Sequence, residues 1–231
     1  MKKGFTLAEV LIALGIVGIV SVLTIPGIMR DYKNRSYVAL LQKTYSQLAN
    51  ATQAAMADEL SDNFYETKSG SATSCTDFTN GKCEKGLGYF LSTYMDPVKY
   101  NCGRGTDLCL AGNAADSYKT LSGANAGTPA NQDCVLTAKG AAVCGFHNPN
   151  NKTTSIIIDV NGKEAPNIVG RDVFVMDIKT DGSLADYNAG NTPGKIGCQA
   201  SQCSTDGAGG IYDIACGCLT NVMEAGWKME Y

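Results

Sequence analysis

Histidine is nearly absent from this chain, and so are the motifs of the common hydrolases and nucleotide-binding enzymes. The one histidine, His147, lies in the polar stretch GFHNPNNK, where such a side chain is most often solvated. The sequence contains no G-x-S-x-G nucleophile elbow, no phosphate-binding P-loop and no H-E-x-x-H zinc motif. Its carboxylates are spread out, so no acid–base pair can be nominated. We therefore expect no catalytic residues, and we do not expect an enzyme.

Charge is scarce as well. Charged residues make up 18% of the chain, and 19 lysines and arginines against 22 aspartates and glutamates give a net charge of −3. No cluster of basic side chains and no platform of aromatic side chains stands out, which argues against a nucleic-acid partner. The 231 residues contain no internal repeat, and most of them would form one domain of ordinary size.

The N-terminal segment holds the longest apolar run. Between Phe5 and Met29, 25 residues carry a single ionisable side chain, that of Glu9. About 20 apolar residues are enough to cross the hydrocarbon core of a bilayer as a helix. Lys2 and Lys3 precede the run and favour the cytoplasmic side for the N-terminus. We therefore predict one membrane-inserting helix, with the rest of the chain exported.

Glu9 has two interpretations on chemical grounds. A carboxylate inside a membrane is costly and usually marks a functional residue. Glu9 lies only four residues into the apolar run, so its side chain could instead snorkel to the interface. A secretory signal would have a shorter apolar core and a cleavage site of small residues after it, and no convincing A-x-A site follows Met29.

The segment from Lys3 to Leu14, KGFTLAEVLIAL, resembles the processing signal of type IV prepilins. The short basic leader, Gly4 before the cut, Phe5 after it and Glu9 in the mature helix all match this signal. Pro26 matches a helix proline that is typical of these subunits. The resemblance implies cleavage between Gly4 and Phe5, N-methylation of the new amine, and assembly with other subunits into a helical filament.

The resemblance also implies roles and partners. Glu9 is placed to meet the cationic N-terminal amine of an adjacent subunit, a pairing that would fix the register inside an apolar bundle. Pro26 cannot donate a helical hydrogen bond, so we expect a kink or a local loosening there. The expected partners are other pilin subunits in a homo- or hetero-filament, a prepilin peptidase and methyltransferase, and the inner-membrane assembly machinery. The expected location is the inner membrane, with an exported head, and afterwards an extracellular or periplasmic filament.

Helical periodicity continues beyond the apolar run. It predicts a helix that extends to about Leu60, and its length of about 80 Å is too great for a soluble domain of this size. The apolar stripe of its second half consists of Tyr37, Leu41, Tyr45, Leu48, Thr52, Ala55 and Met56. We expect a leader over 1–4, a transmembrane or filament-core helix over 5–30, an amphipathic helix over 31–64 and a globular head over 65–231. The expected fold is α+β and pilin-like, with the long helix packed on an antiparallel sheet and disulfide-rich loops around it.

Ten cysteines all lie beyond the membrane segment, on the side where exported cysteines usually pair. Short spacings predict three local disulfides, Cys75–Cys83, Cys102–Cys109 and Cys134–Cys144. The pairing is left open among the remaining four, Cys198, Cys203, Cys216 and Cys218. A zinc site made of these four is an alternative, but it would have neither a C-x-x-C knuckle nor a histidine partner.

Two strong strand signals, Thr153 to Val160 and Asp172 to Lys179, flank a segment rich in Asp, Asn and Gly. Its D-x-N-G…P-N…G-x-D spacing resembles a segment of some pilin-like head domains. Asp159, Asn161 and Asp172 could supply hard oxygen ligands for calcium, although the EF-hand pattern does not match. The alternative is a tight connection between strands, which needs Asn, Gly and Pro in any case. We expect no cofactor unless this segment binds calcium.

Weaker patterns predict the other elements of the head. Leu87 to Tyr94 fits either a short helix or a strand, and Cys134 to Cys144 fits a hairpin with Gly140 in its turn. The Gly/Ala/Ser-rich stretch from Ser117 to Pro129 suggests an exposed loop. Asp213 to Glu224 suggests a short helix, and Trp227 to Tyr231 suggests an edge strand.

The expected function is that of a structural subunit of a type IV pilus or a related pseudopilus. Two related roles stay open: a low-abundance minor or tip subunit with an adhesive or ligand-binding role, and a pseudopilin of a type II secretion system. A membrane-anchored protein with an enzymatic head is a hypothesis from another class, which the missing catalytic motifs disfavour. The number of copies per filament would distinguish a structural subunit from a minor or tip subunit. Enzymatic activity of the pure head domain would reveal a membrane-anchored enzyme.

Overall fold

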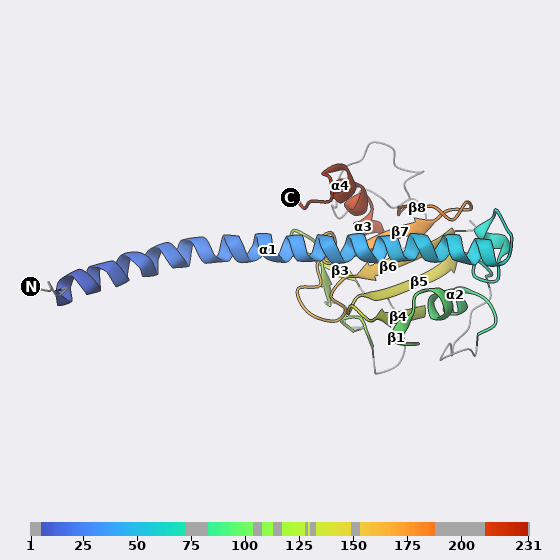
Figure 1. Ribbon diagram of the computed structural model, residues 1–231, viewed down its shortest axis with the longest axis horizontal. Coiled ribbons are helices and arrows are strands. Elements are labelled where there is room, and N and C mark those ends of the chain that lie inside the picture. The colour runs from blue at the N-terminus through green and yellow to red at the C-terminus, as the bar shows by residue number, and fades with distance from the viewer. Residues whose placement is uncertain are drawn as a thin grey trace, which may run out of the picture. The chain divides into compact units, whose positions relative to one another are not determined.

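The computed structural model describes residues 6–72, 83–103, 108–112, 117–127, 129, 133–148, 153–187 and 211–230. The backbone divides into two compact units, Met1–Ser36 (unit 1) and Tyr37–Tyr231 (unit 2). A single helix, α1 (Leu7–Asp58), runs through unit 1 and begins unit 2 (Figure 1). The long helix predicted from the sequence is thus confirmed, and it continues through Pro26.

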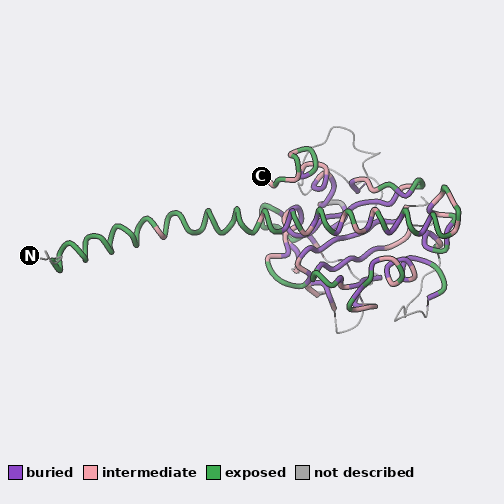
Figure 2. Tube along the Cα trace, viewed as in Figure 1, coloured by how far each residue is buried: buried purple, intermediate pink, exposed green. Residues whose placement is uncertain are grey.

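Unit 1 is an apolar helix without a core of its own. Its described side chains are exposed along the whole length, apart from Ser21 and Asn34, which are half-buried (Figure 2). Leu11 is 61% exposed and Ile12 is 64% exposed. Leaving a side chain of this kind in water forfeits about 1.5–3 kcal/mol relative to burying it. Unit 1 therefore requires lipid or other protein chains around it.

In unit 2, α1 buries one stripe of side chains at spacings of three and four, the period of an amphipathic helix. The buried residues are Tyr37, Val38, Leu41, Thr44, Leu48, Ala51, Thr52, Ala55 and Met56. Hydrogen bonds from two polar side chains of α1, one of them in this stripe, tie the helix to the head. The Thr52 hydroxyl donates to the Gly182 carbonyl at 2.7 Å, and Gln47 Nε2 donates to the Met95 carbonyl at 2.8 Å.

An antiparallel sheet forms the centre of unit 2, as expected. Its six strands lie in the order β1-β4-β5-β6-β7-β8, and α1 crosses it (Figure 1). The strands are β1 (Pro97–Lys99), β4 (Asp133–Thr137), β5 (Ala142–Asn148), β6 (Thr153–Asp159), β7 (Val173–Ile178) and β8 (Leu184–Asp186). Nearly every residue of β6 and β7 is buried. Both faces of these strands are therefore covered, which explains the unbroken apolar runs Ile156–Ile158 and Val173–Met176 within them.

Short helices close the end of the sheet near the C-terminus of α1. They are η1 (Phe64–Glu66) and α2 (Leu87–Tyr94). The Phe64 and Phe90 rings meet edge to face with centroids 5.4 Å apart, and both side chains are fully buried. The segment that the sequence left open between helix and strand is thus a helix.

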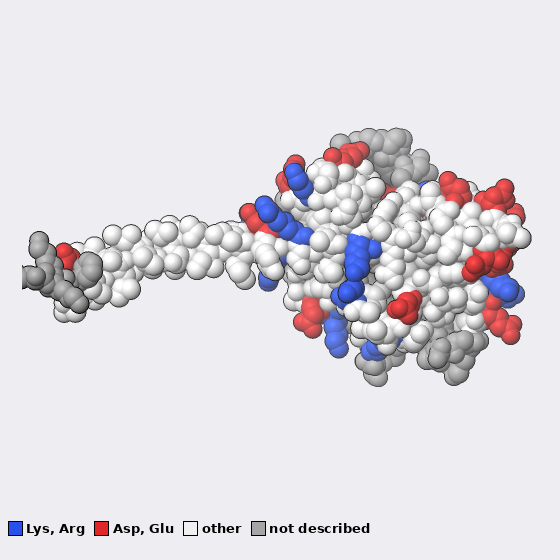
Figure 3. Space-filling view, in the orientation of Figure 1, with Lys and Arg blue, Asp and Glu red and all other residues white. Residues whose placement is uncertain are grey.

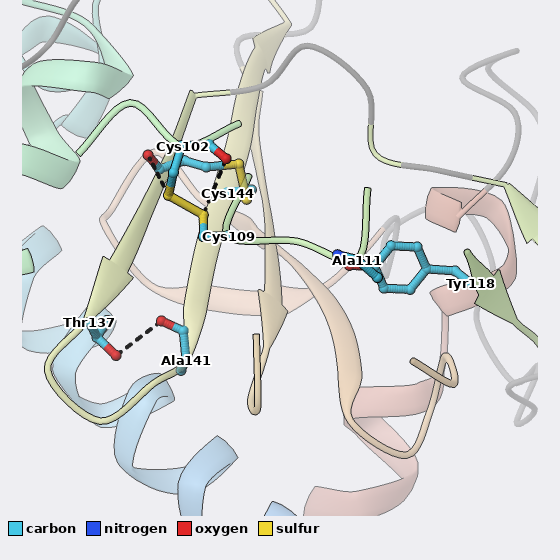
Figure 4. The surroundings of a disulfide bond; sticks show 8 residues. Cys102, Cys109, Ala111, Tyr118, Thr137, Ala141 and Cys144 are labelled. Atoms are coloured by element: carbon cyan, nitrogen blue, oxygen red, sulfur yellow. Dashed lines mark hydrogen bonds between the residues drawn. A yellow bond between two sulfur atoms is a disulfide. The ribbon is translucent and has the colours of Figure 1, made fainter. Parts of the chain in front are cut away.

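The β4–β5 hairpin is confirmed. Leu136 pairs with Ala142 across it, and residues 138–140 make the turn. Gly140 has φ +87°, a value that a side chain would strain. The hydroxyl and the amide of Thr137 both donate to the Ala141 carbonyl, at 3.0 and 2.9 Å, and close the turn (Figure 4).

Two predicted disulfides are present, Cys102–Cys109 and Cys134–Cys144. The second joins directly opposed residues of β4 and β5. The sulfur atoms of Cys109, Cys134 and Cys144 all lie within 4.8 Å of one another, so the two disulfides pack together in the core (Figure 4). A closed loop of this kind typically contributes about 2–4 kcal/mol to stability.

The other cysteines extend this disulfide pattern. Cys83, Cys216 and Cys218 are also disulfide-bonded. The cysteines that lie outside the described residues are Cys75, Cys198 and Cys203. The Cys75–Cys83 pair therefore stays a prediction, and the pairing of the last four cysteines stays open. Sulfurs that are joined in disulfides are not thiolate ligands, which argues against the zinc alternative.

The prediction of an exposed loop from Ser117 to Pro129 was wrong in part. β2 (Tyr118–Lys119) and β3 (Asn125–Gly127) form a separate two-stranded sheet. Tyr118 is fully buried, and its hydroxyl group is bonded inside the head. The sequence suggested a loop because this stretch is rich in Gly, Ala and Ser. Its composition does not show that the Tyr118 ring is buried.

The prediction of an edge strand at the C-terminus was also wrong over the described residues 227–230, which contain no strand. Trp227 has φ +60° and packs edge-on against Tyr45, with ring centroids 5.6 Å apart. The helix predicted from Asp213 to Glu224 is two helices, α3 (Ile211–Ala215) and α4 (Cys218–Glu224). Gly217, at φ +78°, separates them.

Candidate functional site

The N-terminal end of α1 contains the residues selected by the prepilin resemblance. Gly4 and Phe5 lie outside the described residues, and the described part begins at Thr6. The Glu9 carboxylate accepts a hydrogen bond from the Thr6 amide at 2.8 Å and another from the Thr6 hydroxyl at 2.7 Å. The Thr6 hydroxyl in turn accepts from the Glu9 amide at 3.3 Å. These reciprocal bonds form a capping box at the start of α1.

The capping box is a feature that sequence analysis missed, although its signal was present as Thr6-x-x-Glu9 before an apolar run. Both bonds from Thr6 reach Oε2 of Glu9, so Oε1 takes no part in the box. The carboxylate is thereby held beside the residue that follows Phe5. Phe5, where the resemblance puts the new amine, precedes Thr6 and lies four residues before Glu9 in the sequence.

The helix that follows is apolar enough for a membrane. Among the described residues, only α1 is long and apolar enough to cross one. No charged residue occurs between Glu9 and Arg30, so this part of the helix has an uncharged surface (Figure 3). On the face of the head that Figure 3 shows, the acidic and basic side chains of the described residues are scattered. The surface of unit 1 is therefore suited to apolar contacts.

The connection between β6 and β7 brings together two of the calcium candidates, Asp159 and Asp172. Asp172 is fully buried, and its two oxygens accept from the amides of Asn167 at 2.8 Å and Ile168 at 2.6 Å. Burial raises the pKa of the Asp172 carboxyl, and these amides partly offset the shift. Asp172 therefore braces the loop from inside.

Asp159 is fully buried at the end of β6. Its Oδ2 accepts from the Tyr118 hydroxyl at 3.0 Å, and the Tyr118 oxygen accepts from the Ala111 amide at 3.1 Å (Figure 4). Burial, followed by the nearby Asp172, raises the pKa of the Asp159 carboxyl well above its usual range. The third candidate, Asn161, donates from Nδ2 to two carbonyls within the same loop. The buried end of β6 is thus linked to β2 and to the loop after Cys109.

His147 is not the solvated side chain that the sequence suggested. It is half-buried on β5, where Nδ1 lies 3.0 Å from the Thr154 hydroxyl and the ring centroid lies 5.4 Å from that of Tyr65. Burial lowers the pKa of the imidazole. The Tyr65 hydroxyl accepts from the Thr154 amide at 2.7 Å and donates to the Ile178 carbonyl at 2.6 Å. These contacts give His147 a packing role.

Asp186 is a buried acid that sequence analysis did not single out. From the end of β8 it accepts from the Gly217 amide at 3.2 Å and from the Thr220 amide at 2.7 Å. It therefore caps the N-terminus of α4 from another element of the fold. Burial raises the pKa of the Asp186 carboxyl, and the Thr220 and Gly217 amides act in the opposite direction.

Asp186→Asn should change the pH dependence of stability. Because the pKa of Asp186 is higher in the folded protein than the ordinary value of about 3.9, its stabilising contribution is complete at low pH and decreases as pH rises through the folded pKa. Asparagine does not titrate, so the stability of the variant relative to wild type should increase as pH rises above the ordinary carboxyl pKa. Thermal unfolding of the full-length protein in detergent measures this difference. Asp62→Asn, at an exposed site, is the control, and a parallel change in both variants would contradict the assignment.

Comparison with protein families matches residues 1–25 to the prokaryotic N-terminal methylation motif. This motif is typical of type IV pilins and type II secretion pseudopilins, and the match contains Gly4, Phe5 and Glu9. It covers 25 of the 231 residues. No curated protein and no solved structure shows a significant match to the chain.

The motif and the fold agree. A long N-terminal apolar helix, an antiparallel sheet and disulfides give the chain a pilin-like α+β architecture. The chain therefore carries the processing motif of the type IV pilin and pseudopilin family on a pilin-like fold. Proteins of this family are generally structural rather than enzymatic.

Proposed function

We propose that this chain is a prepilin whose mature form is a structural subunit of a type IV pilus or a related pseudopilus. The methylation motif over residues 1–25 carries the proposal. Cleavage after Gly4 would remove Lys2 and Lys3 but leave the whole apolar run on the mature chain. The precursor would be held in the inner membrane by this run, with unit 2 exported.

The exposed surface of unit 1 supports assembly. An apolar helix of this kind is stable in lipid, and it is also stable when the helices of neighbouring subunits replace the lipid. Close packing and selected polar contacts then decide which helices associate, because the hydrophobic effect does not distinguish lipid from protein. Glu9 is the one ionisable side chain in the run, and the proposed contact joins it to the Phe5 amine of an adjacent subunit.

The disulfide pattern of unit 2 favours a second candidate role. Two packed disulfides and three further bonded cysteines stabilise the loops of the head against an extracellular environment. Such a head suits a minor or tip subunit that binds a ligand, present in few copies per filament. Quantitative immunoblotting of sheared filaments separates this role from that of a major subunit, because a major subunit should dominate the filament mass.

The first test of the proposal is processing. The intact mass of the protein extracted from membranes should show the loss of the first four residues and the gain of one methyl group on Phe5. Gly4→Leu should retain the leader, since a large side chain replaces hydrogen at the expected cut. A leader retained in processing-competent cells, or a mature N-terminus beyond Ala13, would contradict the proposal. Electron microscopy of sheared filaments from cells with and without the protein then tests assembly.

A further inference from the structure

The two disulfides Cys102–Cys109 and Cys134–Cys144 meet in the core of the head, and they do so asymmetrically. The sulfur atoms of Cys109, Cys134 and Cys144 lie within 4.8 Å of one another (Figure 4). The sulfur of Cys102 does not belong to this group. Only one sulfur of the first disulfide therefore lies close to both sulfurs of the second.

Backbone hydrogen bonds hold the Cys109 segment in place independently of its disulfide. The Cys109 amide donates to the Cys102 carbonyl at 3.0 Å, and the Cys102 amide donates to the Cys134 carbonyl at 3.1 Å. Two residues further on, the Ala111 amide donates to the hydroxyl of the buried Tyr118 at 3.1 Å. If the Cys102–Cys109 bond opened, these contacts would keep the Cys109 thiol beside the second disulfide.

The second disulfide can change partners without opening the sheet. Cys134 and Cys144 lie opposite each other within the β4–β5 ladder, which continues on both sides of them. β5 is also paired along its whole length with β6. The backbone pairing thus keeps the strands together when the sulfur crosslink is moved. A thiol that is released from its partner can change rotamer, so exchange needs only side-chain movement.

The two disulfides also differ in their access to an external reductant. Cys102 is 1% exposed and Cys109 is 3% exposed, whereas Cys134 and Cys144 are both 0% exposed. Thiol–disulfide exchange requires direct contact between the attacking thiolate and a disulfide sulfur. A reductant in solution would therefore reach the Cys102–Cys109 bond before the Cys134–Cys144 bond.

We propose that Cys109 is the nucleophile of an internal thiol–disulfide exchange with Cys134–Cys144. In the first step, an external dithiol reduces the Cys102–Cys109 bond to two thiols and is itself oxidised to a disulfide. Cys109 then loses its proton, and the thiolate attacks the sulfur of Cys134 or Cys144. A new disulfide forms to Cys109, the Cys134–Cys144 bond breaks, and the displaced sulfur takes up a proton. This second step involves no net oxidation or reduction.

The exchange would make the crosslinking of the head depend on its redox state. In the oxidised head, one disulfide joins the two strands of the β4–β5 hairpin. After partial reduction and exchange, a disulfide would instead join the Cys109 segment to one of these strands. This inference goes beyond the proposed function and concerns the chemistry of the head alone.

Cys102→Ser tests the exchange, because it leaves a Cys109 thiol beside an intact Cys134–Cys144 bond. The full-length variant is kept in detergent, its thiols are blocked with N-ethylmaleimide, and its peptides are mapped by mass spectrometry without reduction. The label should shift in part from Cys109 to Cys134 and Cys144. New disulfides between Cys109 and these two cysteines should accompany the shift.

Cys109→Ser is the matched control. It removes the same disulfide, but the thiol that it leaves, Cys102, lies outside the group of three close sulfurs. Its label should therefore stay on Cys102. Label confined to Cys109 in a folded Cys102→Ser variant overturns the proposal. Equal redistribution of label in the two variants also overturns it.

Wild-type protein decides the question if the variants do not fold by circular dichroism. Partial reduction with dithiothreitol, followed by the same labelling, should give molecules with one label on Cys102 and one on Cys134 or Cys144. Labels that occur only as the native pairs, Cys102 with Cys109 or Cys134 with Cys144, would refute the exchange. The processing and filament tests do not depend on this outcome.

Discussion

Glu9→Val should leave the protein cleaved and membrane-bound but abolish its recruitment into filaments. Valine suits a membrane helix better than a carboxylate does, so insertion should persist. The carboxylate that Thr6 holds at the start of α1 would be missing, and the Phe5 amine of a neighbouring subunit would lose its partner. In a low-dielectric bundle the loss of that partner is far more costly than at a wet surface. Filament yield in the sheared fraction, at equal membrane content, measures the effect.

Two further substitutions separate the charge of Glu9 from its role in the capping box. Glu9→Gln keeps a side chain that can complete the box with Thr6 but carries no charge, so it should fail to assemble. Glu9→Asp keeps the charge with a shorter reach and should assemble at an intermediate level. If Glu9→Gln assembles like wild type, the cap rather than the charge is what matters. If Glu9→Val also does so, Glu9 only snorkels and assembly depends on apolar packing.

Leu48→Ala should lower the free energy of unfolding of the head by about 2–5 kcal/mol, because the truncation leaves a cavity in a packed core. Leu48 is 0% exposed and belongs to the stripe that α1 buries in unit 2. Cleavage and membrane insertion depend on unit 1 and should be unaffected. Incorporation into filaments should fall, because a partly unfolded head is removed by proteases or packs poorly. Thermal unfolding of the full-length protein in detergent gives the change in stability.

Asn50→Ala is the control for this substitution. Asn50 is exposed on the same helix, and surface changes of this type usually alter stability by less than about 0.5 kcal/mol. Alanine is also the better helix former. Equal losses in both variants would show that the helix itself, and not the packing of Leu48, limits the stability of the head.

The sequence predicted the elements whose signals are local. α1 follows from an apolar run and a stripe with the helical period, and β6 and β7 follow from runs of β-branched residues. The β4–β5 hairpin and its disulfide follow from two cysteines at equal distances from Lys139, with Gly140 in the turn. Each of these signals lies within the residues that form the element itself. No contact with a distant segment is needed to predict the element.

Apart from the local capping box of Thr6 and Glu9, the features that sequence reasoning missed depend on contacts between distant segments. Tyr118 is buried because its hydroxyl reaches Asp159, which lies 41 residues further along the chain. Asp186 caps a helix that begins 32 residues later, at Cys218. The Asn167 carbonyl accepts from the Lys119 amide, 48 residues earlier in the chain. None of these relations has a periodicity or a motif that the sequence alone would reveal.

As a membrane anchor, the exposed apolar helix of unit 1 would also restrict encounters between subunits to the two dimensions of the membrane. A chain with such an anchor diffuses in the plane of a bilayer rather than through the volume of the periplasm. Every copy then carries Glu9 at the same depth, and all helices point in the same direction across the membrane. Two subunits therefore need little reorientation before they make contact. Association therefore loses less translational and rotational freedom than it would in solution. In the proposed assembly, the effective concentration of subunits would be set by their number per unit area of membrane, so a modest pool of precursor would sustain filament growth.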